Sequence, residues 1–276
     1  MEWQCDGYWV VTGATGGIGQ AICHELVAYG CKVIATCRDL ERGERLAAQL
    51  RRAASGGAEV RCELLRLDDC ASIRDFAMRI AGVRIASLVN NAGVICRHYG
   101  LVGNGIEQTM AVNCIGTVML TRLLLPMVAD GGSVVFTTSV TRRFHHLSPD
   151  ILVPTARDFS QLGTYGRSKL ALTHYAMHLA DELTGYVRVN CADPGVVNSG
   201  IITMHRWFDP IANVLFRPLI SSPQRGAQSA LCAATSPYSG MIYHHAHYHP
   251  IDKELRRDAA HQRLVAAVDA WLARFL

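Results

Sequence analysis

The stretch that decides the fold reads Thr12-Gly13-Ala14-Thr15-Gly16-Gly17-Ile18-Gly19. It follows an apolar segment at 8–12, which predicts a buried strand, and precedes residues 18–29, whose apolar positions have helical spacing. Glycines permit a tight turn and a close approach of a ligand, and backbone N–H groups at a helix start attract a pyrophosphate. The glycine spacing is three residues and then one, unlike the common G-x-G-x-x-G fingerprint. The turn predicts a phosphate site, with a purely structural turn as the alternative.

Strand-like and helix-like segments alternate on both sides of this turn. Further strands are expected at 32–36, 59–67, 85–90, 133–139 and 187–191. Further helices are expected at 40–54, 72–80, 106–127 and 164–182. Such alternation predicts an α/β fold in which helices cover both faces of a doubly wound, parallel, Rossmann-type sheet.

No linker or repeat interrupts this pattern, so we expect residues 1–276 to form a single domain. Residues 200–224 differ from the rest, because aromatic and aliphatic side chains stand there among prolines. We expect an apolar substrate lobe in that segment. Residues 258–276 have the apolar spacing of a closing amphipathic helix.

Composition excludes several classes of protein. Half of the 276 residues are hydrophobic and the net charge is only +4, which argues against disorder. The basic residues are scattered, so no nucleic-acid partner is expected. We find no signal peptide and no apolar run long enough for a membrane span. Ten cysteines without a C-x-x-C pair favour buried reduced thiols. We therefore expect a cytoplasmic protein.

Two further motifs lie downstream, Asn90-Asn91-Ala92-Gly93 and Tyr165-Gly166-Arg167-Ser168-Lys169. Together with the glycine turn, and in this order, they resemble the short-chain dehydrogenase/reductase family over residues 8–240. The segments 37–43, 91–94 and 225–228 resemble its retinol dehydrogenase-like branch. The resemblance implies a nicotinamide cofactor and hydride transfer between an alcohol and a carbonyl.

A candidate acid–base pair stands on the expected helix at 164–182. Tyr165 and Lys169 are four residues apart and so share one helix face. A free phenol has a pKa near 10, and a neighbouring ammonium together with an oxidised nicotinamide ring would favour the phenolate. Tyr165 is thus the predicted proton carrier. Lys169 is also expected to hold the nicotinamide ribose.

Ser139 ends the expected strand 133–139, where ligands bind in sheets of this kind. Its hydroxyl is expected to donate to the substrate oxygen, with Thr138 and Thr141 as neighbouring alternatives. By the family resemblance, Asn113 is also part of the catalytic group, since its backbone carbonyl would hold a water on a proton path from Lys169. An ordinary polar break in a helix is the alternative for Asn113.

Arg38 predicts NADP(H) as the cofactor. It follows the second strand, where an arginine accommodates the 2′-phosphate and a carboxylate would bind the 2′-hydroxyl of NAD. Asp39 leaves an alternative open, because it could bind a ribose or pair with Arg38. By resemblance, Asp68 approaches the adenine, with Asp69 as a merely capping acid.

The resemblance extends the cofactor site to the loop after the strand at 187–191, where Ser199 stands in place of the usual threonine. Asp193 departs from the branch, whose members tend to have histidine there. The full set expected to bind the cofactor is Gly13, Thr15, Gly17, Ile18, Gly19, Arg38, Asp68, Asn90, Ala92, Gly93, Tyr165, Lys169, Pro194, Gly195, Val197 and Ser199.

The sequence thus predicts an NADP(H)-dependent oxidoreductase acting on a lipophilic alcohol or carbonyl compound, such as a steroid, a retinoid or a polyketide-like ketone. A non-catalytic NADP(H) sensor is the alternative, disfavoured because the tyrosine, lysine and serine are all present. No metal is expected, since a strand would split the histidines at 244–249 between two faces. By resemblance we expect a homodimer or homotetramer through the helices at 106–128 and 164–183. The apolar lobe also allows peripheral membrane contact.

Overall fold

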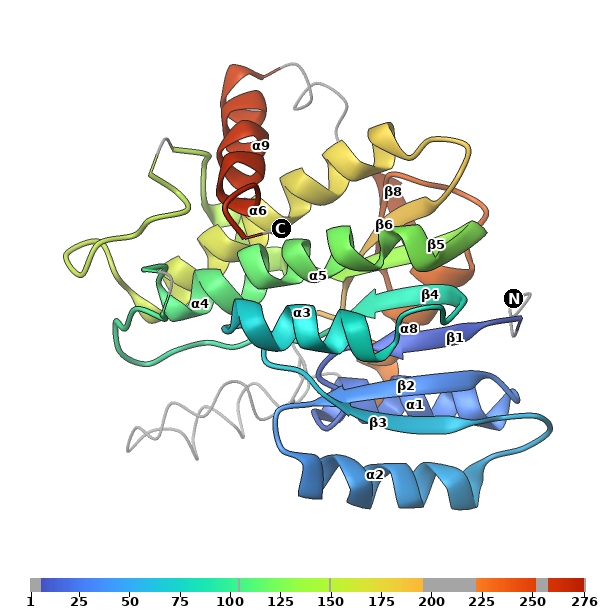
Figure 1. Cartoon of the computed structure of the whole chain (residues 1–276). Helices are drawn as coiled ribbons and strands as arrows, with labels where there is room; N and C mark the ends of the chain where they lie inside the picture. Colours follow the sequence, from blue (N-terminus) through green and yellow to red (C-terminus); the bar gives the residue numbers. More distant parts are fainter. Residues whose placement is uncertain (1–5, 104, 149, 196–221, 252–257, 276) are drawn as a thin grey trace.

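The computed structural model describes residues 6–103, 105–148, 150–195, 222–251 and 258–275. One sheet has the strand order β3-β2-β1-β4-β5-β6-β7-β8 (Figure 1). All of its neighbouring strands are parallel except β7 and β8. The strands are β1 (Tyr8–Val11), β2 (Lys32–Cys37), β3 (Val60–Leu64), β4 (Ile85–Asn90), β5 (Val128–Thr137), β6 (Arg188–Asp193), β7 (Met241–His244) and β8 (His247–Pro250). The order reverses between β1 and β4, and ligands bind at such a point in open α/β sheets.

Helices cover both faces of the sheet. The helices are α1 (Gly17–Ala28), α2 (Leu40–Ala53), α3 (Cys70–Arg79), α4 (Gln108–Met110), α5 (Thr117–Leu124), α6 (Gln161–Glu182), α8 (Pro223–Thr235) and α9 (Ala259–Leu272). One core cluster joins α3, α5, α6 and α9 to the sheet, and the other joins α1, α2 and α8. Successive strand residues enter opposite clusters, as Val10 and Val11 do. The predicted doubly wound α/β fold is confirmed.

The helix expected at 106–127 is not regular. Between α4 and α5 the chain forms a π-helical turn, Ala111–Gly116, and a 3-10 turn, Leu125–Met127, follows α5. A Cβ on Gly116 would lie 1.9 Å from the backbone oxygen of Leu67, so only glycine permits this close packing. Local widenings of this kind often occur at functional sites.

The C-terminal helix α9 packs against α6 of the same chain (Figure 1). The Tyr175 hydroxyl of α6 donates to Asp269 of α9 at 2.6 Å. The rings of His174 and His261 lie between the same helices, with their Nδ1 atoms 3.1 Å apart. These polar contacts accompany the burial of Leu264 and Val268 of α9 in the hydrophobic core.

Two expectations need revision, and a third falls almost entirely outside the described residues. The histidine-rich segment is a hairpin between β7 and β8, in which His244 pairs with His247, rather than one strand. Cys31 is disulfide-bonded, so the expectation of reduced thiols fails at that position. Nearly all of the lobe expected at 200–224 lies outside the described residues, and the part from 223 begins α8.

Candidate active site

A cavity of about 550 Å³ opens at the carboxyl ends of the central strands. It brings together most of the residues that the sequence predicted for the site. Those that line it are Gly13, Thr15, Gly17, Ile18, Gly19, Arg38, Asp68, Ala92, Gly93, Ser139, Tyr165, Lys169, Pro194 and Gly195. Asn90 and Asn113 do not line it. Val197 and Ser199 lie outside the described residues.

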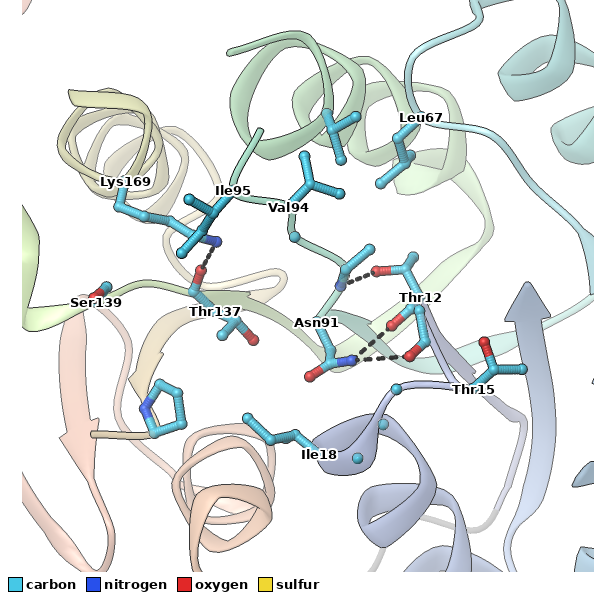
Figure 2. Close-up of a pocket in the computed structure, with 18 of the residues that line it drawn as sticks. Thr12, Thr15, Ile18, Leu67, Asn91, Val94, Ile95, Thr137, Ser139 and Lys169 are labelled. Atoms are coloured by element: carbon cyan, nitrogen blue, oxygen red, sulfur yellow. Dashed lines mark hydrogen bonds between the residues drawn. The ribbon is translucent and has the colours of Figure 1, made fainter. Parts of the chain in front are cut away.

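The glycine turn is locked to the loop that follows β4. Asn91 donates its Nδ2 to the backbone oxygen of Thr12 at 2.9 Å, and the Ala92 N–H donates to the Thr12 hydroxyl at 2.9 Å (Figure 2). Gly13 has a φ of +63°, and a Cβ there would lie 2.9 Å from the Ala92 Cα. A Cβ on Gly19 would lie 2.4 Å from the Gly13 oxygen. A side chain at Gly13 would therefore push the turn away from the loop after β4, and one at Gly19 would distort the turn itself.

The glycine turn and Asp68, which both line the cavity, suit a dinucleotide. Gly17, Ile18 and Gly19 begin α1 and line the cavity, and the N-cap Gly16 supplies no side-chain hydrogen bond to their N–H groups. Such N–H groups lack partners within the helix and attract phosphate. On the far side, the buried Oδ1 of Asp68 accepts no hydrogen bond, although Arg66 lies 3.5 Å away. The donors and the acceptor match the pyrophosphate and the adenosine of a nicotinamide dinucleotide.

The structure separates the acids after β2 and β3 into two that cap helices, Asp39 and Asp69, and one that lines the cavity, Asp68. Asp39 caps α2, because its carboxylate accepts from the Arg42 N–H at 3.1 Å. Asp69 caps α3 by accepting from two N–H groups of its first turn. Asp68 lines the cavity instead. Arg42, which the sequence reasoning missed, lines the cavity beside Arg38. Its position four residues after Arg38, in the first turn of α2, was the available signal.

The structure corrects the assignment of Asn90. This side chain is buried in the core, where its Nδ2 donates to the Thr121 hydroxyl at 3.0 Å. Its neighbour Asn91 lines the cavity and holds the glycine turn. Successive residues at a strand end point to opposite sides, so only one of the two asparagines can reach the site.

Tyr165, Ser139 and Lys169 meet at one end of the cavity. The Lys169 ammonium donates to the Thr137 backbone oxygen at 2.7 Å (Figure 2). The same ammonium lies 5.8 Å from the Tyr165 ring centroid. Burial raises the pKa of Tyr165 to about 12, while its hydrogen bond with Ser139 acts in the opposite direction. Burial also lowers the pKa of Lys169 to about 8. Desolvation is thus the largest influence on the Tyr165 phenol, and the expectation that Lys169 and an oxidised nicotinamide ring favour the phenolate stays a prediction.

The two alternatives to Ser139 have other partners. Thr138 turns into the core, where its hydroxyl and that of Thr173 lie 2.6 Å apart. Thr141 lines the cavity, but its hydroxyl and its N–H both donate to the Ser139 hydroxyl, at 3.0 and 3.3 Å. Ser139 therefore accepts two hydrogen bonds from Thr141 and keeps its own proton for donation, at present to the Tyr165 oxygen.

Asn113 does not line the cavity but is hydrogen-bonded to Val94, which does. Its Oδ1 accepts from the Val94 N–H at 2.8 Å, and its Nδ2 donates to the Val94 oxygen at 2.9 Å. The same Nδ2 lies 3.0 Å from the Ser168 hydroxyl, which in turn donates to the Tyr165 backbone oxygen. The side chain thus connects the loop after β4 to the helix of the acid–base pair. It sits in the π-helical turn, which the sequence spacing did not reveal.

Comparison with known proteins gives one consistent relationship. A family model described as short chain dehydrogenase matches residues 8–206. The chain is 34% identical to Dehydrogenase/reductase SDR family member 13 of Bos taurus, over 92% of this chain and 70% of that protein. It is 34% identical to Retinol dehydrogenase 12 of Mus musculus, over 85% of this chain and 76% of the relative.

Solved structures agree with these sequence matches. An uncharacterised protein from Mycobacterium paratuberculosis superposes with a TM-score of 0.77 at 27% identity, covering 98% of this chain and 94% of that one. A short chain dehydrogenase from Shigella flexneri complexed with NADP superposes with a TM-score of 0.66 at 25% identity. That match covers 86% of this chain and 95% of the other.

The prediction of a cytoplasmic protein is contradicted by two findings. The relatives are named retinol dehydrogenases and Dehydrogenase/reductase SDR family member 13, and these names give a cytoplasmic location no support. Gln108–Met127 is also long and apolar enough to cross a membrane, with a mean hydropathy of 1.5, although the sequence reasoning found no such segment. In the fold, 72% of that apolar window is buried, because the segment packs against the sheet. A cytoplasmic location does not follow from this chain.

Proposed function

The chain belongs to the short chain dehydrogenase family, in its retinol dehydrogenase-like branch, and we propose that it interconverts a carbonyl and an alcohol with NADP(H). The family uses NAD(P)(H) and acts on small substrates. The observation that carries the proposal is the meeting of Tyr165, Ser139 and Lys169 at one end of a cavity whose other end has the features of a dinucleotide site. We further propose that the whole chain is one catalytic domain.

The acid–base step follows from the state of Tyr165. When bound, a nicotinamide dinucleotide supplies or accepts the hydride. A phenol with a pKa near 12 is protonated at neutral pH, which is the form that can donate to a carbonyl oxygen during reduction. The Ser139 hydroxyl donates to the same oxygen and stabilises its developing charge. Oxidation needs the phenolate, which we expect the Lys169 ammonium and the oxidised nicotinamide ring to favour.

The preference for NADP(H) rests on two arginines. Arg38 and Arg42 line the cavity end that lies beyond β2, and guanidinium groups bind phosphate oxygens strongly. Asp39, the acid that follows Arg38 directly, is engaged in capping α2. A related structure that contains NADP supports the same choice.

We propose a lipophilic substrate of retinoid, steroid or polyketide-like character. The side chains around the catalytic end of the cavity are largely apolar, among them Val94, Ile95, Val140 and Leu162. Apolar walls exclude water and provide binding area without naming one molecule. The retinol dehydrogenases among its relatives make retinoids the first compounds to test.

Assembly and membrane contact are further parts of the proposal. The expected homodimer or homotetramer would use α5 and α6, but α9 of the same chain already covers part of α6 through Tyr175 and His174. We propose that any pair of copies forms beside α9 rather than over it. Analytical ultracentrifugation of the whole chain decides between a monomer and an oligomer. Co-sedimentation with lipid vesicles tests peripheral membrane contact.

The deciding experiment follows nicotinamide absorbance with NADPH or NADH and a panel of retinoid, steroid and aliphatic carbonyl compounds. We expect NADPH oxidation that requires both a carbonyl compound and Tyr165, so that Tyr165→Phe is the parallel variant. A preference for NADH would overturn the role of the two arginines. Tight NADPH binding without turnover of any carbonyl would instead favour a non-catalytic sensor.

A further inference from the structure

A buried ion pair joins the two chain segments that flank the catalytic end of the cavity. Arg142 lies in the 3-10 turn Val140–Phe144 after β5, and Asp193 ends β6. The Arg142 Nη1 and the Asp193 Oδ2 are 3.0 Å apart, and their side chains are 7% and 9% exposed. Neither residue was among those that the sequence predicted to act in the site.

Each partner also holds the backbone of a residue that lines the cavity. The same Nη1 of Arg142 donates to the Ser139 oxygen at 2.8 Å. The other carboxylate oxygen of Asp193, Oδ1, accepts from the Gly195 N–H at 3.0 Å. The contacts thus run without interruption from Ser139 through Arg142 and Asp193 to Gly195.

We infer that Arg142 and Asp193 are positioning residues, which hold Ser139 and the cavity-lining Gly195 at a fixed separation. This inference rests on the proposed function, which gives Ser139 its role, and on the expectation that Gly195 binds the cofactor. The two residues touch neither reactant. They act through the backbone of the residues that do.

The sheet already fixes the strands, so the ion pair is not needed for their register. Thr137 pairs with Ala192 in the parallel ladder, and the Thr138 N–H donates to the Ala192 oxygen at 2.8 Å. The ladder ends there, one residue before Ser139 and Asp193. Beyond that point, Arg142 connects the segment after β5 to the end of β6, through its hydrogen bonds to the Ser139 oxygen and to Asp193.

Stability alone is a poor reason to bury such a pair. Desolvation of two charges offsets most of their attraction, and apolar side chains of similar size are often as stabilising. The pair instead takes part in three directional hydrogen bonds, which apolar packing does not provide. A displacement of about 1 Å in a catalytic group can reduce a rate about a hundredfold, so such contacts matter most beside the reacting atoms.

The pair also affects the charge state of the site. The carboxylate of Asp193 raises the pKa of Tyr165 and that of Lys169, and in both cases its effect is smaller than that of desolvation. For Tyr165 the two effects act in the same direction, whereas for Lys169 they oppose each other. Arg142 faces this carboxylate directly, and the His244 ring lies against the Asp193 backbone oxygen at 3.2 Å. Removal of the negative charge should therefore lower the Tyr165 pKa.

Three variants separate these effects. Arg142→Met frees the Ser139 backbone, so we expect kcat to fall about tenfold to a hundredfold with little change in NADPH affinity. Asp193→Ala frees Gly195, so we expect NADPH to bind up to about tenfold more weakly, by titration of tryptophan fluorescence. Asp193→Asn keeps an acceptor for the Gly195 N–H but removes the charge, so the limb of the kcat–pH profile that belongs to Tyr165 should move to lower pH.

The double variant Arg142→Met/Asp193→Asn guards against misfolding, since it leaves no unpaired buried charge. We expect its kcat to be no lower than that of Arg142→Met alone. The matched control is Arg122→Met, which removes another arginine paired with a carboxylate, Glu182, away from the cavity. It should lower the melting temperature without changing kcat, NADPH affinity or the pH profile.

Two results would overturn the inference. One is that the Arg142 and Asp193 variants behave like Arg122→Met, losing stability alone. The other is that the pH profile and NADPH affinity of the Asp193 variants equal those of the wild type. If the wild type reduces no carbonyl at all, the proposed function fails, but weaker NADPH binding by Asp193→Ala with unchanged binding by Arg122→Met would still support the positioning of Gly195.

Discussion

The ammonium of Lys169 lies 5.8 Å from the centroid of the Tyr165 ring and donates to the Thr137 oxygen. The lysine is therefore held by the end of β5 rather than by the tyrosine. Burial keeps the Tyr165 phenol protonated, and Ser139 is the group that offers it a hydrogen bond. This arrangement suits proton donation to a carbonyl, and it makes the phenol the group whose loss should matter most.

We expect Tyr165→Phe to lower kcat by a factor on the order of 10² to 10⁴, because a positioned acid contributes about that much to a proton transfer. NADPH affinity should stay within about twofold of the wild type, since the ring is retained. Initial rates and fluorescence titration measure the two quantities. Tyr186→Phe, on a side chain that is 68% exposed, is the control. Full activity of Tyr165→Phe would remove the tyrosine from the mechanism.

Arg38→Leu and Arg42→Leu should each weaken NADPH binding about tenfold to a hundredfold, since a hydrogen bond to a charged group contributes about 1.5–3 kcal/mol. NADH binding should change little, because NADH has no 2′-phosphate at this end of the cavity. The ratio of the two dissociation constants is the measurement. Arg45→Leu is the matched control, on the exposed side of α2. An unchanged ratio in both variants would place the phosphate elsewhere.

Gly19→Ala should weaken NADPH binding and destabilise the protein by about 1–3 kcal/mol, because the new Cβ meets the Gly13 backbone oxygen. Alanine favours a helix over glycine by about 1 kcal/mol, which offsets only part of this cost. Chemical denaturation and NADPH titration test both effects. Gly57→Ala has no atom within 4 Å of its Cβ and is the control. If Gly19→Ala has the stability and NADPH affinity of the wild type, the turn accommodates a Cβ at this position and the prediction is wrong.

Acid should destabilise the protein through His174. Burial, together with repulsion from His261, lowers the pKa of His174 to about 4, whereas an unfolded chain has a value near 6.5. Between these values the unfolded state binds a proton that the folded state does not, so the free energy of unfolding falls as the pH falls. We expect His174→Gln to remove about 1 to 3 kcal/mol of this fall.

Urea denaturation near pH 7 and near pH 4.5 measures this difference. The control is His24→Gln, on the exposed side of α1, which should leave the pH dependence unchanged. If His174→Gln retains the full dependence on pH, another group causes the loss of stability in acid.

Local spacing alone predicted much of this protein. The glycine turn between a strand and a helix, the alternation of elements, and the four-residue step from Tyr165 to Lys169 each depend on residues close together in the chain. Because helix and strand periods are short, such patterns determine which side chains share a face. They also determine that strand ends gather at one edge of a parallel sheet.

Contacts between distant segments decided the rest. The sequence could not tell Asn90 from Asn91, or show that Asp39 caps a helix while Arg42 reaches the cavity. It pointed to Lys169 and an oxidised nicotinamide ring as influences on the Tyr165 pKa, but it could not show how deeply the phenol is buried. The pairing of Arg142 with Asp193 joins residues 51 positions apart. Hydrogen bonding and desolvation depend on which groups the folded chain brings together, and only the tertiary structure contains that information.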